Sequence, residues 1–166
     1  MQFLDHGFTL AETERLMPVN GKPSDILKQK IDLVLLPYCA KLPGCSYRND
    51  DDCAICGACS YGDVHQACLD AKMRPMTILN FEHLMETLER EAANGASAYI
   101  GSCCEAFYHK HYADFARNGL PGILVDVSRS TCYDLNKQRE AYLGDFEGQT
   151  DMDLALIQKL IAASRK

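Results

Sequence analysis

The chain has 166 residues and a mass of 18.5 kDa, which suits one domain and is too short for two of ordinary size. Hydrophobic residues make up 47% of the chain and charged residues 24%, proportions that exclude the disordered, collagen-like and coiled-coil classes. The net charge of −6 argues against a nucleic acid partner, because affinity for phosphates comes from clustered lysine and arginine.

Residues 1–30 open the chain, and we expect them to form an N-terminal arm. Two prolines and an Asn-Gly turn pair interrupt this segment and leave room for only one short helix, over about 24–30. The remainder, residues 31–166, alternates strand and helix patterns without an internal repeat. We expect this part to be a single α/β cysteine-rich domain.

From Ile31 onward, short apolar segments alternate with longer amphipathic ones. An apolar run that stops at Pro37 is typical of a strand buried on both faces. Apolar residues at helical spacing, between Asn80 and the pair Asn94-Gly95, predict the clearest helix of the chain. In chain order, we expect a strand at 33–36, a long loop at 40–58, a helix at 60–72, a strand at 76–79, a helix at 81–92, a strand at 98–101, a helix at 104–117, a strand at 122–126 and a helix at 151–163.

Strands that are separated by helices pair in parallel through right-handed crossovers. We therefore expect an open, mainly parallel sheet of about four strands with flanking helices. Ligands bind at the carboxyl ends of the strands in such sheets. A cysteine-rich loop and several single cysteines follow those ends, so we expect one rim to gather eight thiols, from Cys39, Cys45, Cys53, Cys56, Cys59, Cys103, Cys104 and Cys132.

Cysteine is the outlier of the composition, with nine residues in 166. The N-terminus lacks a basic segment followed by an apolar one, so no signal peptide is visible. The longest apolar runs, such as Leu33–Leu36, are far shorter than the roughly 20 residues that span a bilayer. We therefore expect a cytoplasmic protein with reduced thiols, which points to metal, cluster or redox chemistry rather than to a disulfide scaffold.

The core motif is Cys53-Ala-Ile-Cys56-Gly-Ala-Cys59. A C-x2-C-x2-C run lets three thiolates project from a tight loop toward one centre, as in iron-sulfur proteins of the ferredoxin type. Gly57 suits a loop that needs a positive φ, and the helix expected from Ser60 would turn its N-terminus toward the thiolates. Cys53, Cys56 and Cys59 are thus the candidate metal ligands, and their fourth partner stays open. Zinc and metal-free thiol chemistry are the alternatives.

Three other cysteines need separate interpretation. Cys68 follows Val64 by four residues on the expected buried face of its helix, so it fits a packing group better than a ligand. Cys103 and Cys104 are adjacent, and an extended strand would point them to opposite faces. Only one of the two is expected to reach the site, and either residue fits that role.

Four stretches of the chain occur together in a known family: Leu35–Cys39 followed by Cys45, the motif Cys53–Cys59, Cys104-Glu105 after a strand, and the turn Gly119–Pro121 followed by a strand and Cys132. On these stretches, which span roughly residues 31–135, the chain resembles the prokaryotic family catalogued as domain of unknown function 116. The chain departs from that pattern at Ser128–Thr131, where a glycine usually precedes the last cysteine.

The resemblance implies a functional set of seven cysteines, which are Cys39, Cys45, Cys53, Cys56, Cys59, Cys104 and Cys132. Members of the family are similar to proteins found beside, or fused with, radical-SAM and lipoate-ligase-like enzymes. This implies a partner role in cofactor or sulfur chemistry.

We therefore expect an iron-sulfur-cluster-binding protein that serves electron transfer, or cluster or sulfur delivery, to a partner redox or radical-SAM-type enzyme. Seven thiolates exceed the four ligands of one four-iron four-sulfur cluster, so one cluster with additional reactive thiols and two clusters are both open. Two alternatives come from other classes: an enzyme that depends on a cluster or a persulfide, and a zinc-stapled interaction module. Neither a nucleic acid nor a membrane is expected as a partner.

Overall fold

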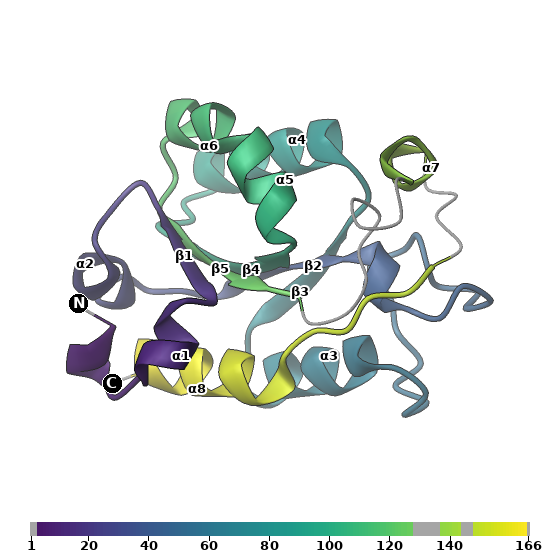
Figure 1. The fold of residues 1–166 in the computed structure, drawn as a ribbon, viewed down its shortest axis with the longest axis horizontal. Coiled ribbons are helices and arrows are strands. Elements are labelled where there is room, and N and C mark those ends of the chain that lie inside the picture. Colours follow the sequence, from purple (N-terminus) through teal and green to yellow (C-terminus); the bar gives the residue numbers. More distant parts are fainter. Residues whose placement is uncertain (1–2, 128–136, 144–147, 166) are drawn as a thin grey trace.

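The computed structural model describes residues 3–127, 137–143 and 148–165, and it shows a five-stranded open sheet between two layers of helices (Figure 1). The strands are β1 (Leu16–Val19), β2 (Leu33–Pro37), β3 (Arg74–Ile78), β4 (Tyr99–Cys103) and β5 (Gly122–Asp126). The α-helices are α1 (Leu10–Thr13), α2 (Pro23–Leu27), α3 (Ser60–Asp70), α4 (Phe81–Ala93), α5 (Glu105–Lys110), α6 (Tyr112–Asn118), α7 (Gln138–Tyr142) and α8 (Leu154–Ser164). Two 3₁₀ turns are η1 (Leu4–His6) and η2 (Tyr38–Ala40).

The sheet confirms the predicted fold class and adds one strand to it. The strand order is β1-β5-β4-β2-β3, and the four strands β2 to β5 run parallel, as predicted. β1 pairs with β5 in the antiparallel sense, from Leu16 opposite Val125 to Val19 opposite Gly122. Pro18 lies inside β1, which an edge strand tolerates because it needs hydrogen bonds on only one side. The segment expected as an arm therefore contributes a strand to the sheet.

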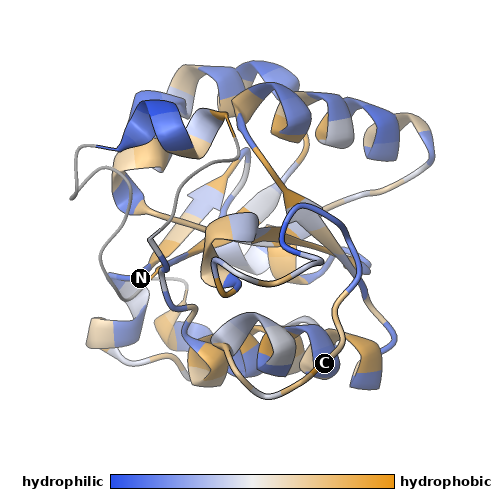
Figure 2. Cartoon of the chain, turned by 90° about the vertical axis from the view of Figure 1, so that its right-hand side faces the viewer, coloured by the Kyte–Doolittle hydropathy of each residue, from blue (hydrophilic) through white to orange (hydrophobic). Residues whose placement is uncertain are grey.

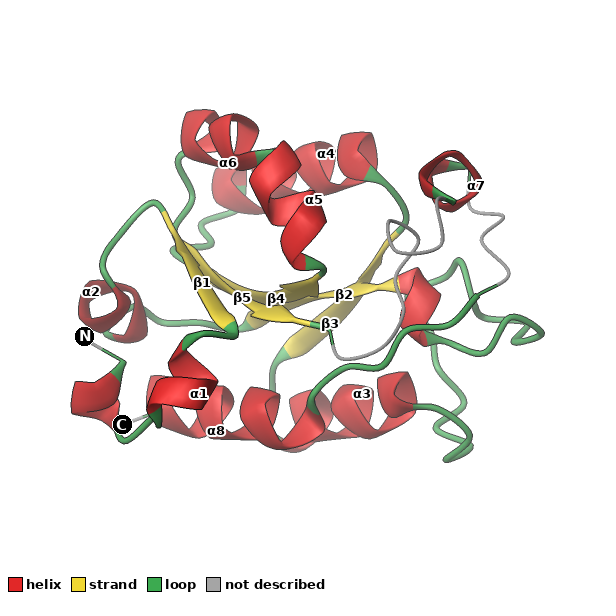
Figure 3. Ribbon diagram, in the orientation of Figure 1, coloured by secondary structure: helices red, strands yellow, loops and turns green. Residues whose placement is uncertain are grey.

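The strands β2, β4 and β5 bury side chains on both faces of the sheet, which explains the apolar runs of β2 and β5 in the sequence, whereas the edge strand β3 is mostly half-buried. On β2, Val34 and Leu36 face the layer formed by α3 and α8. Leu33 and Leu35 face the opposite layer, formed by α4, α5 and α6 (Figure 3). Hydrophobic and hydrophilic segments alternate along the flanking helices, as is typical of amphipathic helices that cover a sheet (Figure 2).

Two glycines occupy positions on the sheet where a larger residue would collide with a neighbour. A Cβ added to Gly122 would lie 2.5 Å from Cζ of the Tyr99 ring, which is completely buried. A Cβ added to Gly101 would lie 2.8 Å from Cδ2 of Leu124. The close packing of β4 against β5 therefore depends on the absence of a side chain at both positions.

The flanking helices largely follow the sequence, with two differences. Asn80 caps α4 as predicted, because its side chain accepts a hydrogen bond from the His83 N–H at 2.9 Å. The helix expected over 104–117 is divided at His111, whose backbone leaves the helical region with φ −108° and ψ 17°. The short helices α1 and α7 have no counterpart in the sequence prediction, which left room for only one short helix before Ile31. None of the described helices combines the length and apolar character that a bilayer crossing requires.

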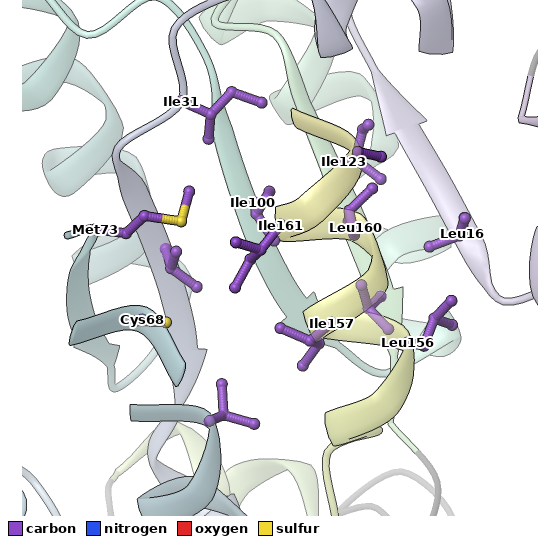
Figure 4. Close-up of a cluster of buried hydrophobic side chains, with 14 of the residues drawn as sticks. Leu16, Ile31, Cys68, Met73, Ile100, Ile123, Leu156, Ile157, Leu160 and Ile161 are labelled. Carbon is purple, nitrogen blue, oxygen red and sulfur yellow. The ribbon is translucent and has the colours of Figure 1, made fainter. Parts of the chain in front are cut away.

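Cys68 belongs to the hydrophobic core between α3, α8 and the sheet, as predicted (Figure 4). Its side chain is fully buried beside Val64, and Leu160 and Ile157 of α8 belong to the same cluster. Burial raises the pKa of the Cys68 thiol to about 12, so the residue is a neutral packing group at physiological pH.

Cys68→Ala is expected to lower the free energy of unfolding by roughly 1 kcal/mol or a little more, because it removes one buried sulfur from a packed site. Urea unfolding followed by circular dichroism measures this loss. Cys68→Ala should also retain any bound metal. Metal loss without further loss of stability would contradict the packing role and make Cys68 a ligand.

Candidate functional site

The carboxyl ends of β2 and β4 form a topological switch point. The connection that leaves β2 passes through α3 on one face of the sheet, whereas the connection that leaves β4 passes through α5 and α6 on the other face (Figure 1). Since β2 and β4 are neighbours, these connections diverge and open a crevice between the two strand ends. The parallel pairing of the strands thus places the candidate site at the edge that the sequence predicted.

A cavity of about 370 Å³ occupies this crevice. The ends of β2 and β4, the first turns of α4 and α5, and α7 contribute its walls. Most of its lining is apolar, and the residues that line it include Cys39, Ile78, Leu79, Phe81, Cys103, Cys104, Phe107, His111 and Thr150.

The described cysteines outside the core form two groups. The cavity group consists of Cys39, Cys103 and Cys104, of which Cys103 packs against the core under α4 and α6. The loop group follows η2 and leads into α3, and its members are Cys45, Cys53, Cys56 and Cys59. Within the loop group, Cys53 and Cys59 pack against the core on the α3 side of the sheet. Cys53 and Cys59 thus pack on one face of the sheet and Cys103 on the other, and Cys132 lies outside the described residues.

Cys103 and Cys104 both line the cavity, whereas strand alternation predicted that only one would reach the site. The strand ends at Cys103, and Cys104 is the N-cap of α5, where its sulfur accepts a hydrogen bond from the Phe107 N–H at 3.4 Å. Burial raises the pKa of the Cys103 thiol well above its ordinary value, and the nearby charges of Cys104, Asp126 and Cys39 raise it further. Burial therefore disfavours the thiolate form of Cys103.

The C-x2-C-x2-C loop is curled by two residues with left-handed backbone conformation. Gly57 has φ 79°, as predicted, and Ile55 has φ 52°, which is uncommon for a β-branched residue. The Ile55 N–H donates a hydrogen bond to Sγ of Cys53 at 3.3 Å. A Cβ added to Gly62 in the first turn of α3 would lie 3.7 Å from the same sulfur, so Cys53 lies against the start of that helix.

Lys41 fixes the cysteine loop, a role that could not be predicted from the sequence. Its side chain is completely buried, and its ammonium donates hydrogen bonds to the carbonyls of Tyr47, Asp50 and Asp52 at 2.5, 2.6 and 3.0 Å. The ammonium also lies 4.4 Å above the centre of the Tyr61 ring. No pattern of spacing or hydropathy distinguishes this lysine from an exposed one, so only the structure identifies it.

Burial lowers the pKa of Lys41, and the charges of Cys45 and Cys53 are the two strongest influences that oppose this shift. Both cysteines therefore lie within electrostatic reach of the same ammonium.

The acidic stretch 50–52 supports the loop rather than being merely solvated. The carboxylate of Asp51 accepts a hydrogen bond from the Thr77 N–H at 2.7 Å, which covers part of the exposed edge of β3. The Thr77 hydroxyl lies 2.5 Å from the Tyr61 hydroxyl, so Thr77 links Asp51 to a side chain of the core. The stretch joins the cysteine loop to the sheet.

Among the described residues, no three histidine, cysteine, aspartate or glutamate side chains are gathered in a metal-binding arrangement. The chemistry of the loop group nevertheless suits an iron-sulfur cluster. The group offers four soft sulfur donors, and one of these sulfurs accepts a hydrogen bond from a backbone N–H. A hard cation fits less well, since it prefers oxygen ligands and the Asp51 carboxylate is engaged with β3.

No protein-family model matches the chain, and neither a curated protein nor a solved structure matches it. The resemblance to domain of unknown function 116 therefore stays a prediction. Two of its features, Cys132 and the departure at Ser128–Thr131, lie outside the described residues.

Proposed function

We propose that the chain is an iron-sulfur-cluster-binding protein that serves electron transfer, or delivers a cluster or sulfur, to a partner redox enzyme. Three thiolates would come from Cys53, Cys56 and Cys59, and Cys45 is our candidate for the fourth. When bound, such a cluster supplies single electrons, or its own iron and sulfide.

The organisation of the cysteine loop carries this proposal. Lys41 ties three loop carbonyls together, and its ammonium lies within electrostatic reach of Cys45 and Cys53. The left-handed residues Ile55 and Gly57 bend the chain between the ligands, and the β-branched Ile55 is strained in this conformation. The N–H of Ile55 points to a ligand sulfur, and such bonds tune the reduction potential of a cluster.

The exposure of the loop cysteines supports transfer to a partner. Cys56 is exposed, whereas Cys53 and Cys59 are half-buried against the core. A centre held by these residues would have one side on the core and the other open to solvent. This arrangement allows a partner protein to approach while the inner ligands hold the centre.

Cys56→Ser is expected to remove most of the bound iron and sulfide, because Cys56 is the middle thiolate of the run. Full-length protein is purified anaerobically after growth with added iron, and its iron, acid-labile sulfide and zinc are quantified. About four iron and four sulfide per chain are expected from the unmodified protein if the loop holds one cluster. Cys68→Ala is the matched control and should retain this content.

Full iron and sulfide in Cys56→Ser would contradict the ligand assignment, and zinc without sulfide would favour the zinc-stapled module. Cys104→Ser, in the cavity group, distinguishes one cluster from two. The iron content should stay near that of the unmodified protein if the loop holds the sole cluster, and should fall by about half if the cavity group holds a second one.

A further inference from the structure

We propose that the cavity between β2 and β4 binds a small, neutral, aromatic molecule that carries one hydroxyl group. This site lies across the sheet from the cysteine loop and does not depend on the cluster proposed there. The volume of the cavity, about 370 Å³, falls within the range of sites for small organic ligands. Its position at the switch point is where α/β sheets bind ligands.

Apolar side chains remain partly uncovered inside this cavity. Ile78 and Leu79 at the end of β3, Phe81 at the start of α4 and Phe107 on α5 all line it, and each is only half-buried. Apolar surface that faces water in a concave site favours a ligand that covers it. The walls therefore select a largely apolar ligand.

The aromatic preference comes from three rings on one wall. The His111 ring stacks on the Phe81 ring, with centroids 4.1 Å apart and an interplanar angle of 11°. The Phe107 ring lies 4.6 Å from His111 at an angle of 51°. All three residues line the cavity, so a planar ligand can make offset-stacked or edge contacts with this wall.

Thr150 provides the polar contact. It lines the cavity, it is completely buried, and its hydroxyl has no hydrogen-bond partner among the described residues. Its own N–H donates to the Cys39 carbonyl at 3.0 Å, which fixes the residue beside the end of β2. A buried hydroxyl without a partner is costly. The Thr150 oxygen has almost no accessible surface, so a ligand hydroxyl reaches it by displacing the atoms that cover it, and then satisfies it as donor or acceptor.

The charges around the cavity favour a neutral ligand. The charged residues Glu82 and Lys110 line it with opposite signs, and both are exposed. The lining thus offers no unbalanced buried charge with which an ionic ligand could pair.

The test uses 2-naphthol, which has two fused rings and one hydroxyl, and naphthalene as its analogue without the hydroxyl. Titration of the ¹⁵N-labelled full-length protein with 2-naphthol should shift the amide signals of Gly101, Cys103 and Thr150, with a dissociation constant below about 1 mM. Thr150→Val should weaken 2-naphthol binding about three- to tenfold and leave naphthalene binding nearly unchanged. Thr87→Val, which removes a buried hydroxyl away from the cavity lining, should bind both compounds as the unmodified protein does.

The proposal is overturned if 2-naphthol leaves the three cavity amides unshifted at 1 mM or shifts only amides elsewhere. Equal binding of 2-naphthol by the Thr150→Val and unmodified proteins would overturn the role of the hydroxyl. Thermal melts of both threonine variants confirm that each is folded before binding is compared. The melting temperature of Thr150→Val should not fall, since this change removes an unsatisfied group.

Discussion

Gly122→Ala is expected to lower the free energy of unfolding by about 3 kcal/mol, because β5 has no room for a methyl group at this position. The added Cβ would lie 2.5 to 2.7 Å from three carbons of the Tyr99 ring. That ring is completely buried and belongs to the core under α4 and α6, so it cannot move aside without opening a packed region. Chemical unfolding in urea, monitored by circular dichroism, measures the loss.

A matched control is Gly44→Ala, in the exposed loop after η2, where an added Cβ would meet no atom within 4 Å. Its free energy of unfolding should stay within about 0.5 kcal/mol of the unmodified protein. The double variant Gly122→Ala with Tyr99→Val should be more stable than the sum of the two single losses predicts, because the smaller side chain relieves the collision. Additive losses would show that Tyr99 is not the cause.

Lys41→Met is expected to lower the free energy of unfolding by about 2 to 4 kcal/mol and to open the cysteine loop. Methionine keeps much of the aliphatic volume but leaves the carbonyls of Tyr47, Asp50 and Asp52 without their common donor. Cleavage of the native protein by a protease should increase within 41–59, and the iron content should fall along with it. Urea unfolding, limited proteolysis with mass spectrometry and iron analysis provide the three measurements.

Lys28→Met removes an exposed lysine after α2 and serves as the control for Lys41→Met. It should change neither the stability nor the proteolysis pattern. If Lys41→Met retained full stability but lost iron, the role of Lys41 would be electrostatic rather than structural. If both properties were unchanged, water would have replaced the ammonium, and the loop would be held by other contacts.

The parts of the fold that depend on local patterns could be predicted from the sequence. The apolar run 33–36 predicts a buried strand, and Asn80 predicts the start of a helix, each from only a few neighbouring residues. The alternation of strands with helices then requires parallel pairing. The same reasoning places Cys39 and Cys104 at one edge, and the positive φ of Gly57 follows from the tight spacing of its neighbours.

Features that depend on distant contacts could not be predicted. The strand β1 contains a proline, and no pattern in the neighbouring sequence predicts that β1 pairs with β5. The separation of the cavity group from the loop group follows from which face of the sheet each connection takes, and cysteine spacing does not encode this. The burial of Lys41 could not be predicted either, because a lysine beside a loop is usually exposed.

The pairing of β1 with β5 determines when the sheet can be completed during synthesis. β1 leaves the ribosome early, but its partner β5 is the last of the described strands, so the N-terminal segment must wait for nearly all of the sheet to emerge. Until β1 pairs with it, a newly made β5 has a free edge that could pair with a strand of another molecule. Closing so long a stretch of chain is entropically costly and makes this pairing a late step in folding. Pairing with β1 therefore replaces the free edge of β5 with an edge that contains Pro18, which is a poorer partner for a strand of another chain.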